Sequence, residues 1–310
     1  STLEEIVERF GIFPSEDIKA RVASSMFLAL TFRQPQHSEV EVWADRTLSV
    51  GEGLATLNEK VRTMAYLLRH HLHVGNLEKA TFAMESLKQL PLTRGASYLS
   101  QILVKLGEAL YLYCTGSFEK SQIIVSEGLE LSRKTGVHVL DFMLLGQAVS
   151  SAIEVNNLST ARNLLEQMET SLVSSKPWDR AFYHILKSRL ALIQKDPEKA
   201  YYHAELGFRL NRTLGAPSTY AFHHLSIAYS MIELGEYHQA AEHIEGAFSM
   251  ATKVKSTIFK SYALFIEAQS ALDQGDEASG LESLRKALSY AKKCGYIQSF
   301  IDIPSKTAEL

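Results

Sequence analysis

The sequence has few cysteines, few prolines and no long apolar run. Its 310 residues include 2 Cys and 7 Pro, and no stretch approaches the roughly 18 consecutive apolar residues of a membrane-spanning helix. The first residues, 1–6, lack the basic start and the apolar core of a signal peptide. They also lack an initial Met, which favours a piece of a longer chain. We therefore expect a cytoplasmic protein that is held together by packing.

An excess of positive charge is also missing. The chain has 32 Lys and Arg against 35 Asp and Glu, for a net charge of −3, whereas nucleic-acid-binding domains are basic. The sequence contains no G-x-x-x-x-G-K-[ST] phosphate loop, no G-x-S-x-G elbow and no paired carboxylates on an apolar background. We expect no nucleic-acid binding by this segment, no membrane association, no cofactor and no catalysis.

A short motif returns about every 40 residues along the whole chain. Each copy opens with Gly, Asn or Lys and has a small residue five positions later. The copies begin at Gly75, Gly116, Asn156, Lys195, Gly235 and Gly275. We call these six residues the marker positions. A fixed period of this length is typical of an array of like units.

Each unit is predicted to be a pair of amphipathic helices. A second break follows each marker by about twenty residues, often at a glycine suited to a helix C-terminus, and the apolar residues between breaks recur at helical spacing. Small residues recur at equivalent positions of both helices, which would allow close helix approach. They are Ala109, Ser188, Ala228 and Ala268 in first helices and Ala80, Ser121, Ala161, Ala200 and Ala240 in second helices.

The period extends over nearly the whole chain. It predicts seven helix pairs in residues 15–295, the first at 15–33 and 37–50, preceded by a capping helix in 1–14 and followed by a truncated helix in 296–310. Residues 1–310 are thus expected to form a single all-α solenoid domain. In such an array distant units do not touch, so Cys114 and Cys294 are expected to be small buried side chains without a disulfide.

These features resemble the tetratricopeptide (TPR) repeat, stretched from its usual length of about 34 residues to about 40. The longer unit is similar to the sensor region of MalT-like transcription regulators, which are signal-responsive ATPases ending in a LuxR-type DNA-binding domain. Residues 287–302, where a helix ends in Gly-Tyr before an apolar Phe-containing turn, resemble the close of that region. The resemblance implies a TPR-like superhelix and an excised sensor segment.

In TPR folds the first helices line a concave groove, and their exposed positions face the ligand. Arginine, tyrosine and histidine at those positions would suit an extended peptide, a carboxylate or a sugar-like ligand. The candidate groove residues are Arg62, Arg69, His73, Tyr113, Arg189, Tyr229 and Gln269, with Glu154 among them and apolar residues between them. Those apolar residues are expected mainly to fill the core.

The histidines are interpreted as packing residues. His70 and His73 lie three apart on one helix face and could share a metal, but the sequence supplies no further ligand pattern nearby. We expect no metal site there.

Two functions from different classes fit these observations. The first is a non-catalytic sensor or scaffold region of a MalT-like regulator that binds an effector or partner in its groove. The alternative is a free-standing TPR interaction adaptor, either chaperone-docking or peptide-responsive. A chaperone-type carboxylate clamp needs Lys and Asn at fixed groove positions, and no matching Asn accompanies Arg69 and Arg189.

Overall fold

The fold is known from a computed structural model, which describes residues 2–54, 56–170, 172, 176–214 and 219–294. These residues form fifteen α-helices and two short 3₁₀ helices, Gly51–Gly53 and Leu92–Arg94, so the predicted all-α class is confirmed. None of the described helices combines the length and apolarity needed to cross a bilayer. The helix predicted for residues 296–310 lies outside the described residues.

After α1 (Thr2–Arg9), consecutive helices pack as seven antiparallel pairs, as predicted. The pairs are α2 (Glu16–Arg33) with α3 (Val40–Val50), α4 (Leu57–Val74) with α5 (Leu77–Gln89), α6 (Tyr98–Cys114) with α7 (Phe118–Thr135), α8 (Asp141–Glu154) with α9 (Leu158–Thr170), α10 (Pro177–Ile193) with α11 (Pro197–Leu214), α12 (Tyr220–Glu233) with α13 (Tyr237–Lys253), and α14 (Thr257–Asp273) with α15 (Glu277–Cys294).

The marker positions are the turns inside the pairs, and all six have a positive φ. The values are 84° at Gly75, 76° at Gly116, 54° at Asn156, 59° at Lys195, 80° at Gly235 and 81° at Gly275. Left-handed backbone ends a helix while its last carbonyls find partners. At Gly75, for example, the N–H groups of residues 75 and 76 both donate to the His71 carbonyl. The marker is therefore a helix-ending signal.

The small residues predicted to lie between helices are all fully buried. Ala80, Ala161 and Ala240 on second helices have no exposed surface, and neither do Ala109 and Ala228 on first helices. Side chains of this size let the two helices of a pair approach closely. The register of the repeat therefore follows directly from the sequence.

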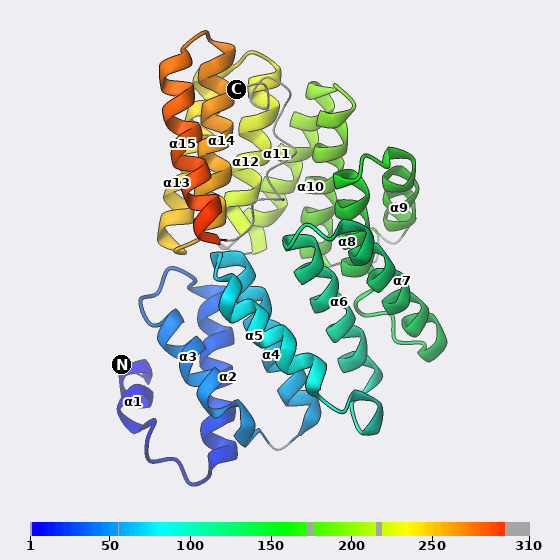
Figure 1. The fold of residues 1–310 in the computed structure, drawn as a ribbon, viewed down its shortest axis with the longest axis vertical. Coiled ribbons are helices and arrows are strands. Elements are labelled where there is room, and N and C mark those ends of the chain that lie inside the picture. Colours follow the sequence, from blue (N-terminus) through cyan, green and yellow to red (C-terminus); the bar gives the residue numbers. More distant parts are fainter. Residues whose placement is uncertain (1, 55, 171, 173–175, 215–218, 295–310) are drawn as a thin grey trace.

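The array bends through a full turn, so that its last pair meets its second pair; we call this arrangement the closed ring. Figure 1 shows the pairs following one another around a turn, so that α14 and α15 come to face α4 and α5. α14 contacts α4. One hydrophobic core contains Phe27 and Leu72 from the first two pairs together with Phe265 and Cys294 from the last. The expectation that distant units do not touch is therefore wrong, because the rotation from pair to pair completes a turn within seven pairs.

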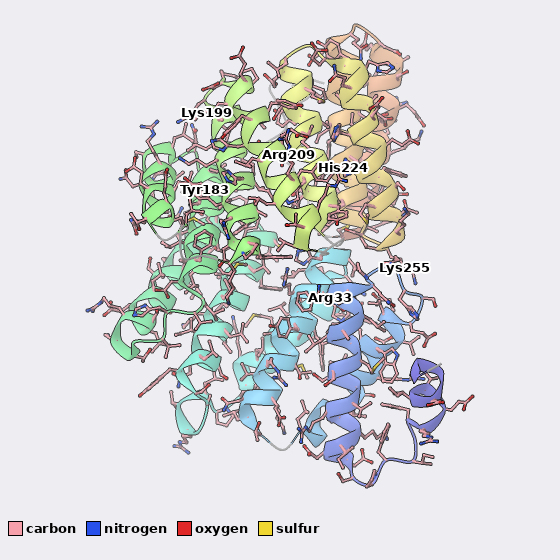
Figure 2. The ribbon with its side chains drawn as sticks, turned by 180° about the vertical axis from the view of Figure 1, so that it is seen from behind. Arg33, Tyr183, Lys199, Arg209, His224 and Lys255 are labelled. Carbon is pink, nitrogen blue, oxygen red and sulfur yellow. The ribbon has the colours of Figure 1, made fainter. Side chains whose placement is uncertain are left out.

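Two hydroxyl groups make the contact between the ends of the ring. Ser256 Oγ donates to the His73 carbonyl at 2.6 Å, and Thr257 Oγ1 donates to the Val74 carbonyl at 2.8 Å. The last four carbonyls of a helix have no partner within it, so the hydroxyl groups at the start of α14 supply hydrogen bonds to the carbonyls at the end of α4. We call this the closure contact. Viewed from behind, Arg33 and Lys255 lie beside it (Figure 2).

Candidate ligand-binding site

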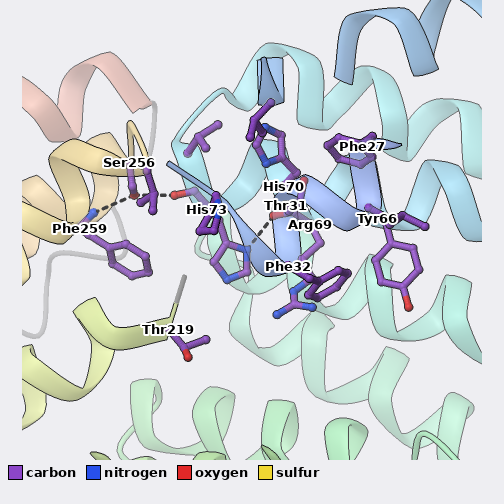
Figure 3. A pocket seen from close by; sticks show the side chains of 15 residues that line it. Phe27, Thr31, Phe32, Tyr66, Arg69, His70, His73, Thr219, Ser256 and Phe259 are labelled. Atoms are coloured by element: carbon purple, nitrogen blue, oxygen red, sulfur yellow. Dashed lines mark hydrogen bonds between the residues drawn. The ribbon is translucent and has the colours of Figure 1, made fainter. Parts of the chain in front are cut away.

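A pocket lies where the first pairs meet the last. It has a volume of about 60 Å³, which is room for a few water molecules or one small polar group. Its fifteen lining residues come from α2, α3, α4, α14 and the segments that precede α3, α12 and α14 (Figure 3). We call it the closure pocket. It exists only because residues far apart in sequence are brought together by the ring.

Arg69 supplies the positive charge of the closure pocket. Its guanidinium carbon lies 5.4 Å from the centre of the Phe32 ring and 5.7 Å from the centre of the Trp178 ring. Phe32 is on α2 and Trp178 is on α10, so the two aromatic contacts come from helices of the first and the fifth pair. Stacking on aromatic rings holds a guanidinium in place and leaves its N–H groups able to bind an anion.

No carboxylate among the described residues pairs with Arg69. Burial lowers the pKa of this arginine below its usual value, yet a guanidinium stays protonated in proteins. A half-buried, charged donor group without an acidic partner is costly. Its five donors therefore favour an anion from outside the chain, most simply a carboxylate, which an arginine binds with two parallel hydrogen bonds.

His73 lies one turn after Arg69 on α4 and provides an acceptor. Its Nδ1–H donates to the Arg69 carbonyl at 2.8 Å (Figure 3). Burial, together with the nearby Arg69 charge, lowers the pKa of His73 to about 4, so the ring is neutral near pH 7. A neutral imidazole that donates through Nδ1 keeps a lone pair on Nε2. The closure pocket therefore combines a cation with a neutral acceptor.

Apolar and hydroxyl groups form the rest of the wall. The Phe259 ring lies 6.4 Å from the His73 ring, and the Tyr66 ring packs edge-on against Phe32 at 5.6 Å. Ser256 both makes the closure contact and accepts a hydrogen bond from the Phe259 N–H. The pocket wall and the closure contact thus share residues, and a ligand here would touch both ends of the ring.

Tyr113, Glu154 and Arg189 form a second polar cluster on α6, α8 and α10. Tyr113 donates to Glu154 Oε1 at 2.6 Å, and Arg189 donates to the same oxygen at 2.6 Å. Burial opposes the charge of Arg189, but Tyr113 and Glu154 outweigh it and raise its pKa. This arginine is already neutralised by Glu154, so the cluster links three successive first helices rather than presenting a free cation.

The remaining predicted groove residues lie apart from the closure pocket. Arg62 is exposed two turns before Arg69 on α4. Tyr229 on α12 packs against the small core around Ala191. Gln269 is buried, and its side-chain amide donates to Asp273 at 2.8 Å. Of the seven predicted residues, the structure places Arg69 and His73 in one pocket and Tyr113 with Arg189 in one network.

Sequence reasoning missed the aromatic residues that surround Arg69 and the hydroxyls that close the ring. Phe32, Trp178 and Ser256 belong to pairs one, five and seven, and no periodic signal relates their positions. His70 and His73, weighed together as metal ligands, have different partners: His70 Nε2 lies 2.8 Å from Glu41 Oε1, while His73 bonds the Arg69 carbonyl.

Comparison with known proteins finds solved structures with a similar fold but no relative by sequence. No protein-family model matches the chain, and no curated protein matches its sequence. Among solved structures, a Rap protein complexed with competence and sporulation factor is similar, with a TM-score of 0.63 and 11% identity over 89% of this chain and 77% of that one.

A second similar structure comes from Pyrococcus horikoshii. It is a signal transduction ATPase with numerous domains (STAND) that has a tetratricopeptide repeat sensor, with a TM-score of 0.50 and 12% identity. The match covers 94% of this chain and 48% of that one, so the chain spans about half of the larger protein. The chain therefore has a TPR-like helical-repeat fold.

Proposed function

We propose that this chain is a non-catalytic sensor or scaffold region that binds a carboxylate-bearing effector in its closure pocket, as part of a MalT-like transcription regulator. The observation that carries the proposal is Arg69, a charged side chain stacked between two aromatic rings with no acidic partner among the described residues. The small volume of the pocket suits the acidic end of a ligand, such as a peptide C-terminus or an organic acid.

Binding at this place would act on the ring as a whole. A ligand that touches α2, α4 and the start of α14 together stabilises the closed ring relative to any more open arrangement, and a ligand shifts an equilibrium only by such a difference in affinity. The first and last pairs would then move relative to each other when the ligand leaves. This is how a segment without catalytic residues would pass a signal to neighbouring domains.

The fold comparisons support the proposal and its rival about equally. The STAND protein carries its TPR sensor within a larger ATPase, which favours a regulator. The Rap structure holds competence and sporulation factor, which favours the second candidate, a free-standing peptide-responsive TPR adaptor. A phosphate loop encoded upstream, or a LuxR-type domain encoded downstream, would decide for the regulator, and a stop codon shortly after Leu310 would decide against it.

The binding proposal can be tested with a library of short peptides that have free C-terminal carboxylates. Peptides selected on the chain are then measured by fluorescence anisotropy, each with a free and with an amidated C-terminus. We expect amidation and Arg69→Gln each to weaken binding by at least about 10-fold, as expected for the loss of a charged hydrogen-bonding pair.

Arg62→Gln is the matched control, since it removes the same charge from an exposed position two turns away on the same helix. It should leave the affinity unchanged. Equal affinity of the wild-type chain and the Arg69→Gln variant would show that the carboxylate does not bind in the closure pocket.

A further inference from the structure

His71 is buried without a hydrogen-bond partner. Its exposed fraction is 1%, and neither Nδ1 nor Nε2 has a partner among the described residues. Buried polar side chains in folded proteins are nearly always hydrogen-bonded, so an orphaned imidazole points to a partner that the polypeptide itself does not supply. The adjacent residues show what kind of partner would fit.

Two further metal-ligating side chains lie beside His71. His70 precedes it on α4, and Glu41 reaches over from α3, with Glu41 Oε1 only 2.8 Å from His70 Nε2. Each of the three residues offers one ligand atom, and these three atoms all lie within 4.8 Å of one another. No other group of three such residues occurs in the part of the chain that the structure describes.

We propose that Glu41, His70 and His71 bind a divalent transition-metal ion of the zinc type and so join α3 to α4. Two imidazole nitrogens and one carboxylate oxygen suit such an ion, which bonds them at about 2.0–2.2 Å and takes water as a fourth ligand. Ligand atoms around a tetrahedral ion are then about 3.3 Å apart. Glu41 Oε1 and His70 Nε2 are 2.8 Å apart, and the ligand atoms of all three residues lie within 4.8 Å of one another, so small side-chain rotations would complete the site.

The surroundings allow an ion to enter. The Glu41 side chain is 34% exposed, whereas that of His70 is 6% exposed, so the carboxylate connects the buried imidazoles to solvent. Lys79 is a cation whose charge acts on both Glu41 and His71, and its ammonium group is paired with Asp45 at 2.5 Å. That pairing reduces its repulsion of a bound ion.

Two other histidine pairs among the described residues do not indicate a metal site. His184 with His203 and His224 with His243 each have Nδ1 atoms 3.1 Å apart. In each pair one ring donates to the other, so these nitrogens are satisfied without a metal. The two pairs occupy equivalent places in successive units, which indicates a role in packing the two helices of a unit.

The metal site is independent of the proposed effector binding, although the two are neighbours. His70 also lines the closure pocket, and its ring packs edge-on against Phe27 at 5.3 Å. An ion held by His70 would fix that part of the pocket wall. Effector binding does not require the ion.

Titration of the chelator-treated 310-residue chain with ZnCl₂ by isothermal calorimetry tests the site, and CoCl₂ titration followed by visible absorption reports the coordination geometry. We expect one ion per chain, a d–d absorption band typical of low-coordinate Co²⁺, and a higher Tm with Zn²⁺. Glu41→Gln and His71→Gln should each weaken Zn²⁺ binding by at least about 10-fold and remove the Tm increase.

His238→Gln is the control, because it removes an exposed histidine on α13; it should bind Zn²⁺ like the wild type. Circular dichroism checks that each variant folds. If His71→Gln does not fold, Glu41→Gln decides alone, since glutamine retains the size of a partly exposed side chain. No saturable binding by the wild-type chain, or wild-type affinity in Glu41→Gln, would overturn the proposal.

Discussion

Replacing Gly75 by alanine tests whether the ring is closed in solution. Gly75 ends α4 with a φ of 84°, and an added Cβ would lie 2.7 Å from Cys294 Sγ and still closer to Thr257 Oγ1. Both of those atoms belong to the last helix pair. Gly235 occupies the equivalent turn of another pair with a φ of 80°, but an added Cβ there meets nothing within 4 Å. The two glycines thus differ in the closure contact alone.

The expected magnitudes follow from this difference. Alanine at either position adopts a left-handed backbone, which costs about 1–2 kcal/mol. At Gly75 the extra carbon must also displace Thr257 and Cys294, and overpacking of this kind adds about 1–3 kcal/mol. We therefore expect Gly75→Ala to reduce the free energy of unfolding by about 2–5 kcal/mol, and Gly235→Ala by about 1–2 kcal/mol.

Urea denaturation followed by circular dichroism measures both losses, with the m-value as a check on cooperativity. Small-angle scattering gives a second readout, because Gly75→Ala should raise the radius of gyration while Gly235→Ala leaves it unchanged. Equal losses of stability in the two variants, together with identical scattering profiles, would refute the closed ring.

Three further outcomes are expected. Lys195→Gly should stabilise the chain by about 0.5–1 kcal/mol in urea denaturation, because Lys195 has a φ of 59° without being glycine; Asn156→Gly should gain less, since asparagine tolerates this conformation. Glu154→Gln should cost about 1–3 kcal/mol by leaving Arg189 without its partner, and the double change with Arg189→Met should recover most of that loss in a double-mutant cycle. Burial lowers the pKa of His223 to about 3, so as the pH falls below about 6.5 the unfolded chain protonates this histidine while the folded chain does not. The free energy of unfolding should therefore fall by up to about 3 kcal/mol between about pH 6.5 and 4.5. His223→Leu should make the free energy of unfolding depend less on pH in this range.

The repeat could be predicted from sequence because each of its features is local. A positive φ at Gly235 and a buried methyl group at Ala240 each depend on contacts within one pair, and every pair repeats the same requirement. Period, spacing and residue size therefore predicted the helix pairs and their register. The same reasoning selected Arg69 and His73, since both lie at the inward phase of a first helix.

The closure pocket could not be predicted in the same way. Whether pair seven meets pair two depends on a small rotation between successive pairs, and that rotation adds up over the array without leaving a motif. The aromatic partners of Arg69 and the hydroxyl of Ser256 follow from this rotation alone. Adjacent histidines point in different directions on a helix, so the partnership of His71 with Glu41 also depended on how α3 crosses α4.

The shared core of the first and last pairs changes how the chain can be divided. In an open array each end pair has one neighbour, so removing it loses a single interface. Here Phe27 and Leu72 belong to the same hydrophobic core as Phe265 and Cys294. Deletion of either end should therefore expose apolar surface at both. In a fragment that lacks α14 and α15, α4 loses the packing that α14 provides, and so does α12. We therefore expect the first and last pairs to unfold together, so that the stability of the chain is not a simple sum over its repeats.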